Sequence, residues 1–308
     1  MAASVLNDPQ FHDETAAFAF VEARLWPCGP VCHHCKGTER IGLMGGKSTR
    51  IGLYKCYKCR KPFTVRMGTV FESSHIEMHK WLQAIYLMCS SKKGISTNQL
   101  HRTLRISLKS AWFLSHRIRE AMTSLGMEPM GGEGAVVEID ETYIGRKEGM
   151  EKRRGTAHKH AVLTLIERGG SARSFHVDGT KAADLLPIIK ANVAPETHVM
   201  TDEAGQYGAL SKHFAAHDFT QHSLGEYVRG NVHSNTVEGF YSVFKRGMKG
   251  VYQHCGENHL RRYVAEFDFR YSNRVRLGAN DTERAGRALQ GVVGKRLTYQ
   301  TTRGGTPA

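Results

Sequence analysis

The stretch GAVVEIDETYI, residues 134–144, decides the fold class of this chain. It reads as a β-strand, in which successive side chains point to opposite faces of a sheet. Val137 and Ile139 therefore line one face, whereas Asp140 lies on the other face, which it shares with Glu138. The pattern predicts a core strand that carries an acidic side chain at its centre.

Strand and helix patterns continue downstream of this strand. Two further strands, at 160–167 and 173–177, are separated by the turn RGGSA. A helix at 181–192, a short strand at 198–202 and a later helix at 235–250 follow. We expect the order strand, strand, strand, helix, strand, helix, strand, helix. This is the layout of the RNase H-like fold, an α/β architecture in which helices flank a mixed five-stranded sheet on both faces.

Three acidic residues fall on elements that converge in such a fold. Asp140 lies in the middle of the first strand, Asp202 ends the fourth, and Glu238 lies near the start of the late helix. Carboxylate oxygens can hold two divalent ions about 3.5–4 Å apart, which activate the attacking oxygen and stabilise the leaving oxygen in phosphoryl transfer. The pattern predicts a catalytic site for two Mg²⁺ or Mn²⁺ ions. Asn235, nearly on the same helix face as Glu238, is the alternative third site residue, because it offers a neutral oxygen.

Four cysteines have the spacing of a zinc site. Cys32 and Cys35 form one C-x-x-C pair, Cys56 and Cys59 form another, and 20 residues separate the pairs. Each pair can form a knuckle that presents two thiolates to one ion, and two knuckles complete a tetrahedral site. Redox-active thiols are the weaker alternative, because neither pair ends a strand of a βαβ unit. We expect a structural Zn²⁺, without which so small a ribbon could not fold.

The charge balance indicates a polyanionic partner. Lys and Arg total 43 against 29 Asp and Glu, so the net charge is +14, and each cation that neutralises a phosphate releases condensed counterion. Helices at about 96–104 and 108–122, joined by a short turn, predict a helix–turn–helix whose second helix carries Lys109 and Arg117 to DNA. The alternative is an ordinary helical hairpin that packs on the catalytic domain.

Composition divides the chain into four regions. We expect a zinc ribbon at 1–68, a helical DNA-binding region at 69–128, a catalytic domain at 129–278 that follows the glycine-rich stretch 126–134, and a fraying C-terminal tail at 279–308. The chain contains no run of 18 apolar residues and no secretory signal, so we expect a cytoplasmic protein with no membrane partner.

Several motifs resemble those of one transposase family. They are VEIDETYIG around Asp140, TDEAGQY at Asp202, HSNTVEGFYSVFKRGMKGVYQH around Glu238, the pattern WPxGPxCxxC from Trp26 to Cys35, and the 35 residues that separate Asp202 from Glu238. From about residue 20 to 275 the chain resembles the zinc-ribbon, ISXO-type DDE transposases of bacterial insertion sequences.

This resemblance implies roles for residues and partners. The ribbon and helices would bind the terminal inverted repeats, while Asp140, Asp202 and Glu238 would cut the 3′ ends and transfer them to target DNA. Lys245, on the same helix face as Glu238, would contact a DNA phosphate, with Arg246 beside it. Pairing of two DNA ends implies a homodimer or a higher assembly.

Two other functions stay open. An RNase H-like nuclease or resolvase would use the same metal chemistry without strand transfer. A non-catalytic zinc-ribbon regulator would bind DNA alone, but such a protein has no reason to cluster carboxylates that repel phosphate. The predicted zinc ribbon and helix–turn–helix favour the transposase, because a transposase must recognise its DNA ends before it joins them.

Overall fold

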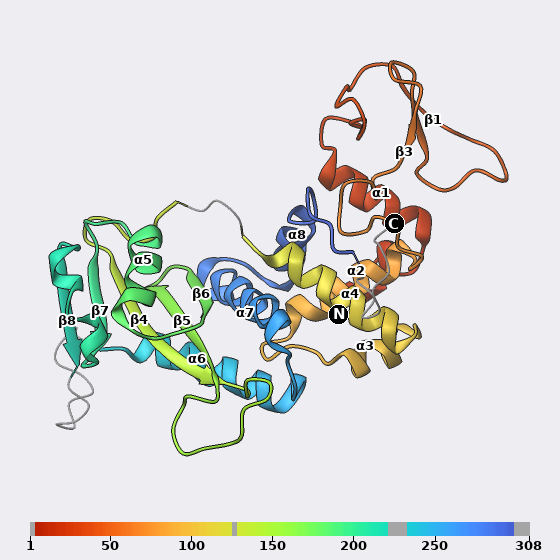
Figure 1. Ribbon diagram of the computed structural model, residues 1–308. Helices are drawn as coiled ribbons and strands as arrows, with labels where there is room; N and C mark the ends of the chain where they lie inside the picture. The colour runs from red at the N-terminus through yellow and green to blue at the C-terminus, as the bar shows by residue number, and fades with distance from the viewer. Residues whose placement is uncertain (1–3, 125–127, 221–232, 299–308) are drawn as a thin grey trace. The chain divides into compact units, whose positions relative to one another are not determined.

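The computed structural model describes residues 4–124, 128–220 and 233–298 of the 308-residue chain. The chain divides into two compact units (Figure 1). Unit 1 comprises Met1–Ser91, Ile95–Met122 and Asp281–Ala308, and unit 2 comprises Lys92–Gly94 and Thr123–Asn280. Part of the glycine-rich stretch 126–134 and the end of the expected tail lie outside the described residues.

Unit 2 contains a mixed five-stranded sheet with the strand order β6-β5-β4-β7-β8. β5 pairs antiparallel with β4 and β6, whereas β7 pairs parallel with β4 and β8. The strands are β4 (Val136–Ile144), β5 (His160–Glu167), β6 (Ala172–Val177), β7 (His198–Asp202) and β8 (Ala216–Thr220). The order and directions are those of the RNase H-like fold, so the predicted fold class is confirmed.

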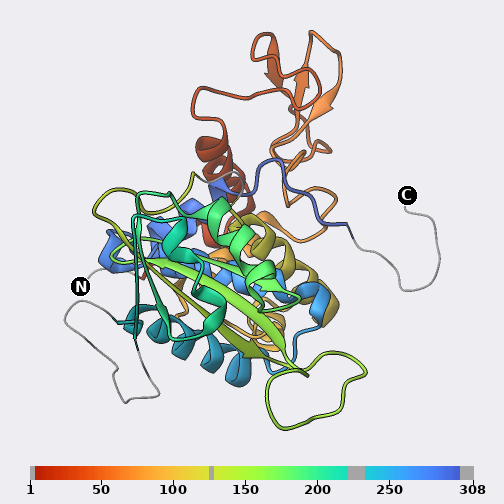
Figure 2. The same cartoon turned by 60° about the vertical axis from the view of Figure 1, so that its left-hand side comes forward.

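Helices cover both faces of this sheet (Figure 2). Val137 and Ile139 of β4 pack in one apolar cluster with side chains of α5. Ile144, on the other face of the same strand, packs in a second cluster with side chains of α6 and α7. The alternation along β4 therefore supplies both layers of the core. The helices are α5 (Ala182–Asn192), α6 (Asn235–Gly247) and α7 (Glu257–Ser272).

The fifth strand differs from the expected order. β8 follows β7 with only two 3-10 turns between them, η3 (Gly205–Tyr207) and η4 (Leu210–Lys212), so the expected helix before the last strand is wrong. Each of these two turns buries one side chain, Tyr207 in η3 and Leu210 in η4, in the apolar cluster that contains the side chains of α5. Two buried side chains need no amphipathic helix, and the short turns are enough to place them.

The zinc ribbon of unit 1 is a three-stranded antiparallel sheet. Trp26, Tyr54 and Phe63 form a small aromatic cluster beside the cysteines. The Tyr54 hydroxyl donates to Glu22 of the preceding helix at 2.9 Å. Ile41 and Met67 complete this small apolar cluster, and its size agrees with a fold that depends on its metal. The elements are α1 (Glu14–Leu25), β1 (Ile41–Leu43), β2 (Tyr54–Cys56) and β3 (Pro62–Phe63).

The rest of unit 1 is helical. The Ser96 side chain accepts from the Gln99 amide at 3.1 Å and caps α3, as predicted. Arg105 then adopts a left-handed conformation (φ 51°), and α4 begins three residues later. The helix–turn–helix is therefore present as a backbone motif. The helices are α2 (Met78–Ser90), α3 (Thr97–Leu104), α4 (Leu108–Met122) and α8 (Asp281–Gln290).

The segment expected as a tail contributes α8 to unit 1. Arg284, Ala288 and Leu289 are buried on one side of this helix, and the Arg284 guanidinium donates to the Cys89 carbonyl of α2 at 2.9 Å. The described chain also has short helical turns η1 (Val5–Asn7), η2 (Pro9–Phe11), η6 (Met248–Tyr252) and η7 (Val275–Leu277). Among the described residues, no helix combines the length and apolar character needed to span a membrane.

Candidate active site and zinc site

Asp140 and Asp202 lie on neighbouring parallel strands. The ladder between β4 and β7 runs from Val136 opposite His198 to Glu138 opposite Met200. The next two residues along each strand lead to Asp140 and Asp202, where the ladder has ended. Both carboxylates are half-buried at the point where the strands separate, so the sheet register brings two of the predicted ligands together.

The pKa of Asp140 reflects its burial and the negative charges of the other two predicted acids, Asp202 and Glu238. Burial and the negative charges of Glu141, Asp202 and Glu238 together raise the pKa of Asp140 to about 8, against a hydrogen bond from the Glu141 amide that lowers it. Such repulsion requires the carboxylates to lie close together. A divalent cation would reverse the repulsion, because carboxylate oxygens are the ligands that Mg²⁺ and Mn²⁺ prefer.

Glu238 reaches the site from α6. It is exposed one turn after the helix begins, and its Oε1 accepts from the Ser234 hydroxyl at 3.0 Å. Asn235, the first residue of α6, is also exposed and lies one turn earlier. The charge of Glu238 contributes to the raised pKa of Asp140, so Glu238 lies near enough to Asp140 for the two carboxylates to interact.

Glu138 fixes the start of α6, a role that the sequence analysis did not assign. Its side chain is fully buried, and its Oε2 accepts from the backbone amides of Thr236 and Val237 at 2.8 and 3.0 Å. These are amides of the first helical turn, which have no partner inside the helix. The N-cap residue Ser234 makes no side-chain cap hydrogen bond. The β4 carboxylate therefore takes the role of a cap and also meets the positive end of the helix dipole.

Arg168 completes this contact between β4 and α6. Its Nε donates to Glu138 Oε1 at 2.6 Å, and a terminal nitrogen donates to the His233 carbonyl at 2.8 Å. A buried carboxylate needs a cation and hydrogen bonds to offset its desolvation, and Glu138 has both. Since Glu138 is two residues from Asp140 on the same strand face, the network sets Glu238 on α6 relative to Asp140.

Glu141 lies on the other side of β4 and holds the loop after Asp202. Its carboxylate accepts from Gln206 Nε2 at 2.8 Å and from the Tyr207 hydroxyl. Burial raises the pKa of Glu141 despite the hydrogen bond from Tyr207. Each carboxylate oxygen of Glu141 therefore accepts a hydrogen bond from the loop that follows Asp202.

The four cysteines form a tetrahedral cluster. Cys32 Sγ lies 3.6 Å from Cys59 Sγ, and Cys35 Sγ lies 3.7 Å from Cys56 Sγ. A tetrahedral ion with Zn–S bonds of 2.3 Å separates its sulfur atoms by about 3.8 Å. The cluster therefore fits Zn²⁺ and is a structural zinc site.

Backbone geometry prepares the knuckles for the ion. The residue after each second cysteine, Lys36 or Arg60, is left-handed with φ near 60°, so the chain turns sharply back. Hydrogen bonds, chiefly from the backbone of Cys59, lower the pKa of Cys56 to about 7, whereas, against a hydrogen bond from the Lys61 backbone, burial and the neighbouring thiols raise the pKa of Cys59 to about 11. The thiolate is the form that binds metal, and Cys56 is the thiol of this pair that loses its proton first.

The predicted DNA contacts divide into exposed and buried residues. Lys109 is exposed at the start of α4, and Lys245 and Arg246 are exposed near the end of α6. Arg117 is only 5% exposed, and its guanidinium donates to the Val70 and Glu72 carbonyls at 2.8 and 2.7 Å. The prediction that Arg117 contacts DNA is wrong, because unit 1 packs around the middle of α4.

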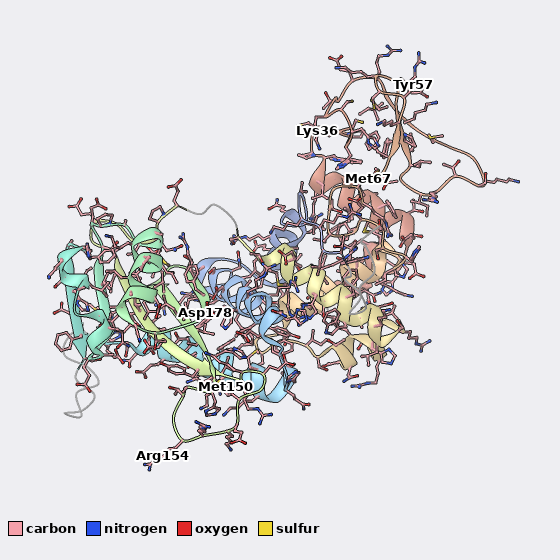
Figure 3. All side chains as sticks on the ribbon, viewed as in Figure 1. Lys36, Tyr57, Met67, Met150, Arg154 and Asp178 are labelled. Carbon is pink, nitrogen blue, oxygen red and sulfur yellow. The ribbon has the colours of Figure 1, made fainter. Side chains whose placement is uncertain are left out.

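A basic loop joins β4 to β5. Lys152, Arg153 and Arg154 are consecutive and exposed, and Figure 3 shows Met150 and Arg154 on this loop, with Arg154 pointing away from the sheet. The sequence analysis did not single out this loop, although three adjacent cations between two predicted strands could have indicated it. The loop adds positive charge to unit 2.

An RNase H-like sheet with converging carboxylates, carried beside a four-cysteine zinc ribbon, defines the class of DNA-acting transposases. Residues 131–272 match the family described as the ISXO2-like transposase domain, and residues 12–62 match the transposase zinc-ribbon domain. The two matches together span more than half of the chain, which belongs to this family of insertion-sequence transposases.

Relatives agree with this assignment. The chain is 29% identical over 264 residues to an uncharacterized protein in transposable element ISH50 of Halobacterium salinarum, a match that covers 80% of this chain and 86% of the relative.

Two solved structures show weaker similarity. The simian T-cell lymphotropic virus intasome in complex with PP2A regulatory subunit B56 gamma aligns with a TM-score of 0.30 and 15% identity over 55% of this chain and 67% of that chain. A pre-cleavage Mos1 transpososome aligns with a TM-score of 0.26 and 13% identity over 68% and 73% of the two chains. These TM-scores are too low to support an inference about this chain.

Proposed function

We propose that this chain binds the terminal inverted repeats of an insertion sequence, cleaves the 3′ ends and joins them to target DNA. The observation that carries the proposal is geometric: the neighbouring parallel strands β4 and β7 carry Asp140 and Asp202, and Glu138 of β4 fixes the start of α6, the helix that carries Glu238. Three carboxylates from two strands and a helix are costly to bring close together unless cations neutralise them.

Asp140, Asp202 and Glu238 would hold two Mg²⁺ or Mn²⁺ ions. When bound, the ions would supply charge neutralisation at the attacking and leaving oxygens. Asp140 and Asp202 are half-buried on the sheet, whereas Glu238 is exposed on α6, where it would be accessible to a bound DNA backbone. Asn235 would add a neutral oxygen at the same helix face.

DNA recognition falls to unit 1 in this proposal. Within α4 only Leu108 and Lys109 are exposed, next to the exposed Ser107 that precedes the helix, and the N-terminal residues of a recognition helix are those that reach base edges. The ribbon would add backbone contacts through exposed cations such as Lys58 and Arg60.

Unit 2 would hold the DNA backbone near the carboxylates. Lys245 and Arg246 extend from the helix that carries Glu238, and the loop with Arg153 and Arg154 adds two further cations. Joining two ends requires at least two active sites, so we propose a homodimer or a higher assembly on DNA, in the cytoplasm.

A strand-transfer assay tests the proposal. Purified protein is mixed with a labelled end of its own element, a plasmid target and Mg²⁺ or Mn²⁺. We expect a joined product that disappears with EDTA and with Asp202→Asn but persists with Glu148→Gln, which changes an exposed carboxylate of the β4–β5 loop. Cleavage without joining would indicate a nuclease or resolvase, and specific binding with neither reaction would indicate a regulator.

A further inference from the structure

Three metal-binding side chains gather in unit 2 outside the carboxylate site. His160 begins β5, His176 lies near the end of β6, and Glu257 begins α7. Each offers a donor atom, and these atoms lie within 4.8 Å of one another. The two imidazole rings meet edge to face with centroids 5.3 Å apart.

The strand register places both histidines on one face. His176 pairs with Val162 across β5 and β6, and His160 is two residues from Val162 on β5, so all three side chains share a face. This is the face on which Val162 packs with side chains of α6 and α7. Glu257, at the start of α7, approaches the pair from the covering layer.

His160 points to a ligand. Its side chain is 3% exposed, and its Nδ1 is buried without a hydrogen-bond partner among the described residues. The nearest acidic oxygen, Glu257 Oε1, lies 3.7 Å away, which is too long for a hydrogen bond. Buried polar atoms almost always have partners, and an orphan nitrogen facing an acid and a second imidazole suggests a missing cation.

The cluster is separate from the carboxylate site. His160 pairs with Ile144 of β4, which is four residues beyond Asp140 on the same strand. Four residues of strand span roughly 13 Å. Ions held by Asp140 and Asp202 therefore could not also be held by His160.

The donor set narrows the choice of ion. Mg²⁺ and Ca²⁺ require oxygen ligands, whereas two imidazoles and one carboxylate suit divalent transition ions, of which Zn²⁺ binds such a set in a tetrahedral geometry. Tetrahedral Zn²⁺ with bonds of about 2.0–2.1 Å separates its donors by about 3.4 Å, close to the 3.7 Å between Nδ1 of His160 and Oε1 of Glu257. We propose that His160, His176 and Glu257 form a second zinc site, with water at the fourth position.

Such an ion would brace the catalytic unit. It would join the paired strands β5 and β6 to the first turn of α7, which otherwise approaches them at this point through a distant ion pair. Because Glu257 is exposed, its side chain can rotate to close the site. The ion would therefore stabilise the layer that α6 and α7 form over the sheet.

Zinc content of the full-length protein tests the site. Wild type should retain about two zinc ions per chain after dialysis, one of them in the Cys₄ ribbon. His176→Gln and Glu257→Gln should each lower this to about one, while His254→Gln, a matched change at an exposed histidine of the same unit, should leave it unchanged. In this experiment wild type denotes the chain whose only change is Asp140→Asn, which every variant also carries, so that zinc in the carboxylate site is not counted.

Cobalt substitution separates the two sites. Thiolate ligands give Co²⁺ an intense charge-transfer band, which only the ribbon can produce, because the second site has no sulfur. His176→Gln should keep this band, which would show that the ribbon of the variant is folded, and lose the second equivalent of Co²⁺. One metal ion per wild-type chain, or two in every variant, would overturn the proposal.

Discussion

Cys32 and Cys35 are separated by two residues on one turn of the ribbon, whereas Asp140, Asp202 and Glu238 come from two strands and a helix of unit 2. In the ribbon the knuckle backbone itself sets the ligand geometry, and the metal supplies most of the stability. In the carboxylate site the sheet and helices set the geometry, and the repelling charges weaken the apo fold. The ribbon site therefore depends on its metal to fold, whereas the fold of unit 2 positions the carboxylates before any metal binds.

The largest test of this contrast replaces the acids. Asp140→Asn or Asp202→Asn should lower 3′-end cleavage by about 10⁴-fold, because lost metal ligands remove several kcal/mol of transition-state stabilisation. Binding to the terminal repeats, measured by gel shift, should stay unchanged. Variants that lose binding while they retain cleavage would contradict the division between the two units.

Cys35→Ser should damage the zinc ribbon and leave the carboxylate site intact. We expect loss of the ribbon zinc and a fall in specific affinity for the repeats of about 10³-fold, toward the non-specific level. Zinc content and competition binding measure the two effects. Cys28→Ser, at an exposed cysteine outside the cluster, is the control, and an equal loss in both variants would argue against the four-cysteine assignment.

Glu138→Gln tests whether the carboxylate site is held in place by its supports. We expect a cleavage rate about 10–100-fold lower and a higher Mg²⁺ concentration for half-maximal rate, because the start of α6 is no longer fixed. Both are measured in a metal titration of 3′-end cleavage.

Glu266→Gln gives the matched control for Glu138. Glu266 is fully buried and paired with Arg270 and Tyr252, so its loss also breaks a buried ion pair. It should lower stability without changing the metal dependence. If both variants shift the Mg²⁺ response equally, Glu138 has only a structural role.

The raised pKa of Asp140 should make the stability of the metal-free protein depend on pH. Its pKa is raised from 3.8 to about 8, so the folded state holds a proton that the unfolded state has released, and the free energy of unfolding falls as pH rises from about 4 to 8. Without metal, Asp140→Asn should therefore be more stable than wild type near pH 8 by about 1–3 kcal/mol, with little difference near pH 4. Urea unfolding at several pH values measures this, and a difference that does not change with pH would contradict it.

The smallest effect belongs to single DNA contacts. Lys109→Ala should weaken binding a few-fold and reduce the salt dependence by about one phosphate contact. Arg117→Ala should instead lower the unfolding temperature, because two backbone carbonyls lose their donor. Thermal unfolding and salt-dependent binding separate the two, and an altered salt slope for Arg117→Ala would restore it as a DNA contact.

The sequence predicted the helices and strands better than it predicted which side chains are buried. Alternation identified β4, and Ser96 identified the start of α3, because both signals are local. The same reasoning placed Arg117 on a DNA-facing helix, and the structure buries it, since burial depends on what packs over α4. A helix before the last strand was also expected, and short 3-10 turns replace it.

By itself the sequence determined the zinc ligands and the order of the three acids along the chain, because knuckle geometry and strand alternation are set over a few residues. Only the tertiary structure decided that Glu138 caps α6, that Arg117 is internal and that His160 meets His176 and Glu257. Each of these contacts joins elements distant in the chain. Their geometry depends on sheet register and helix packing, which no local pattern specifies.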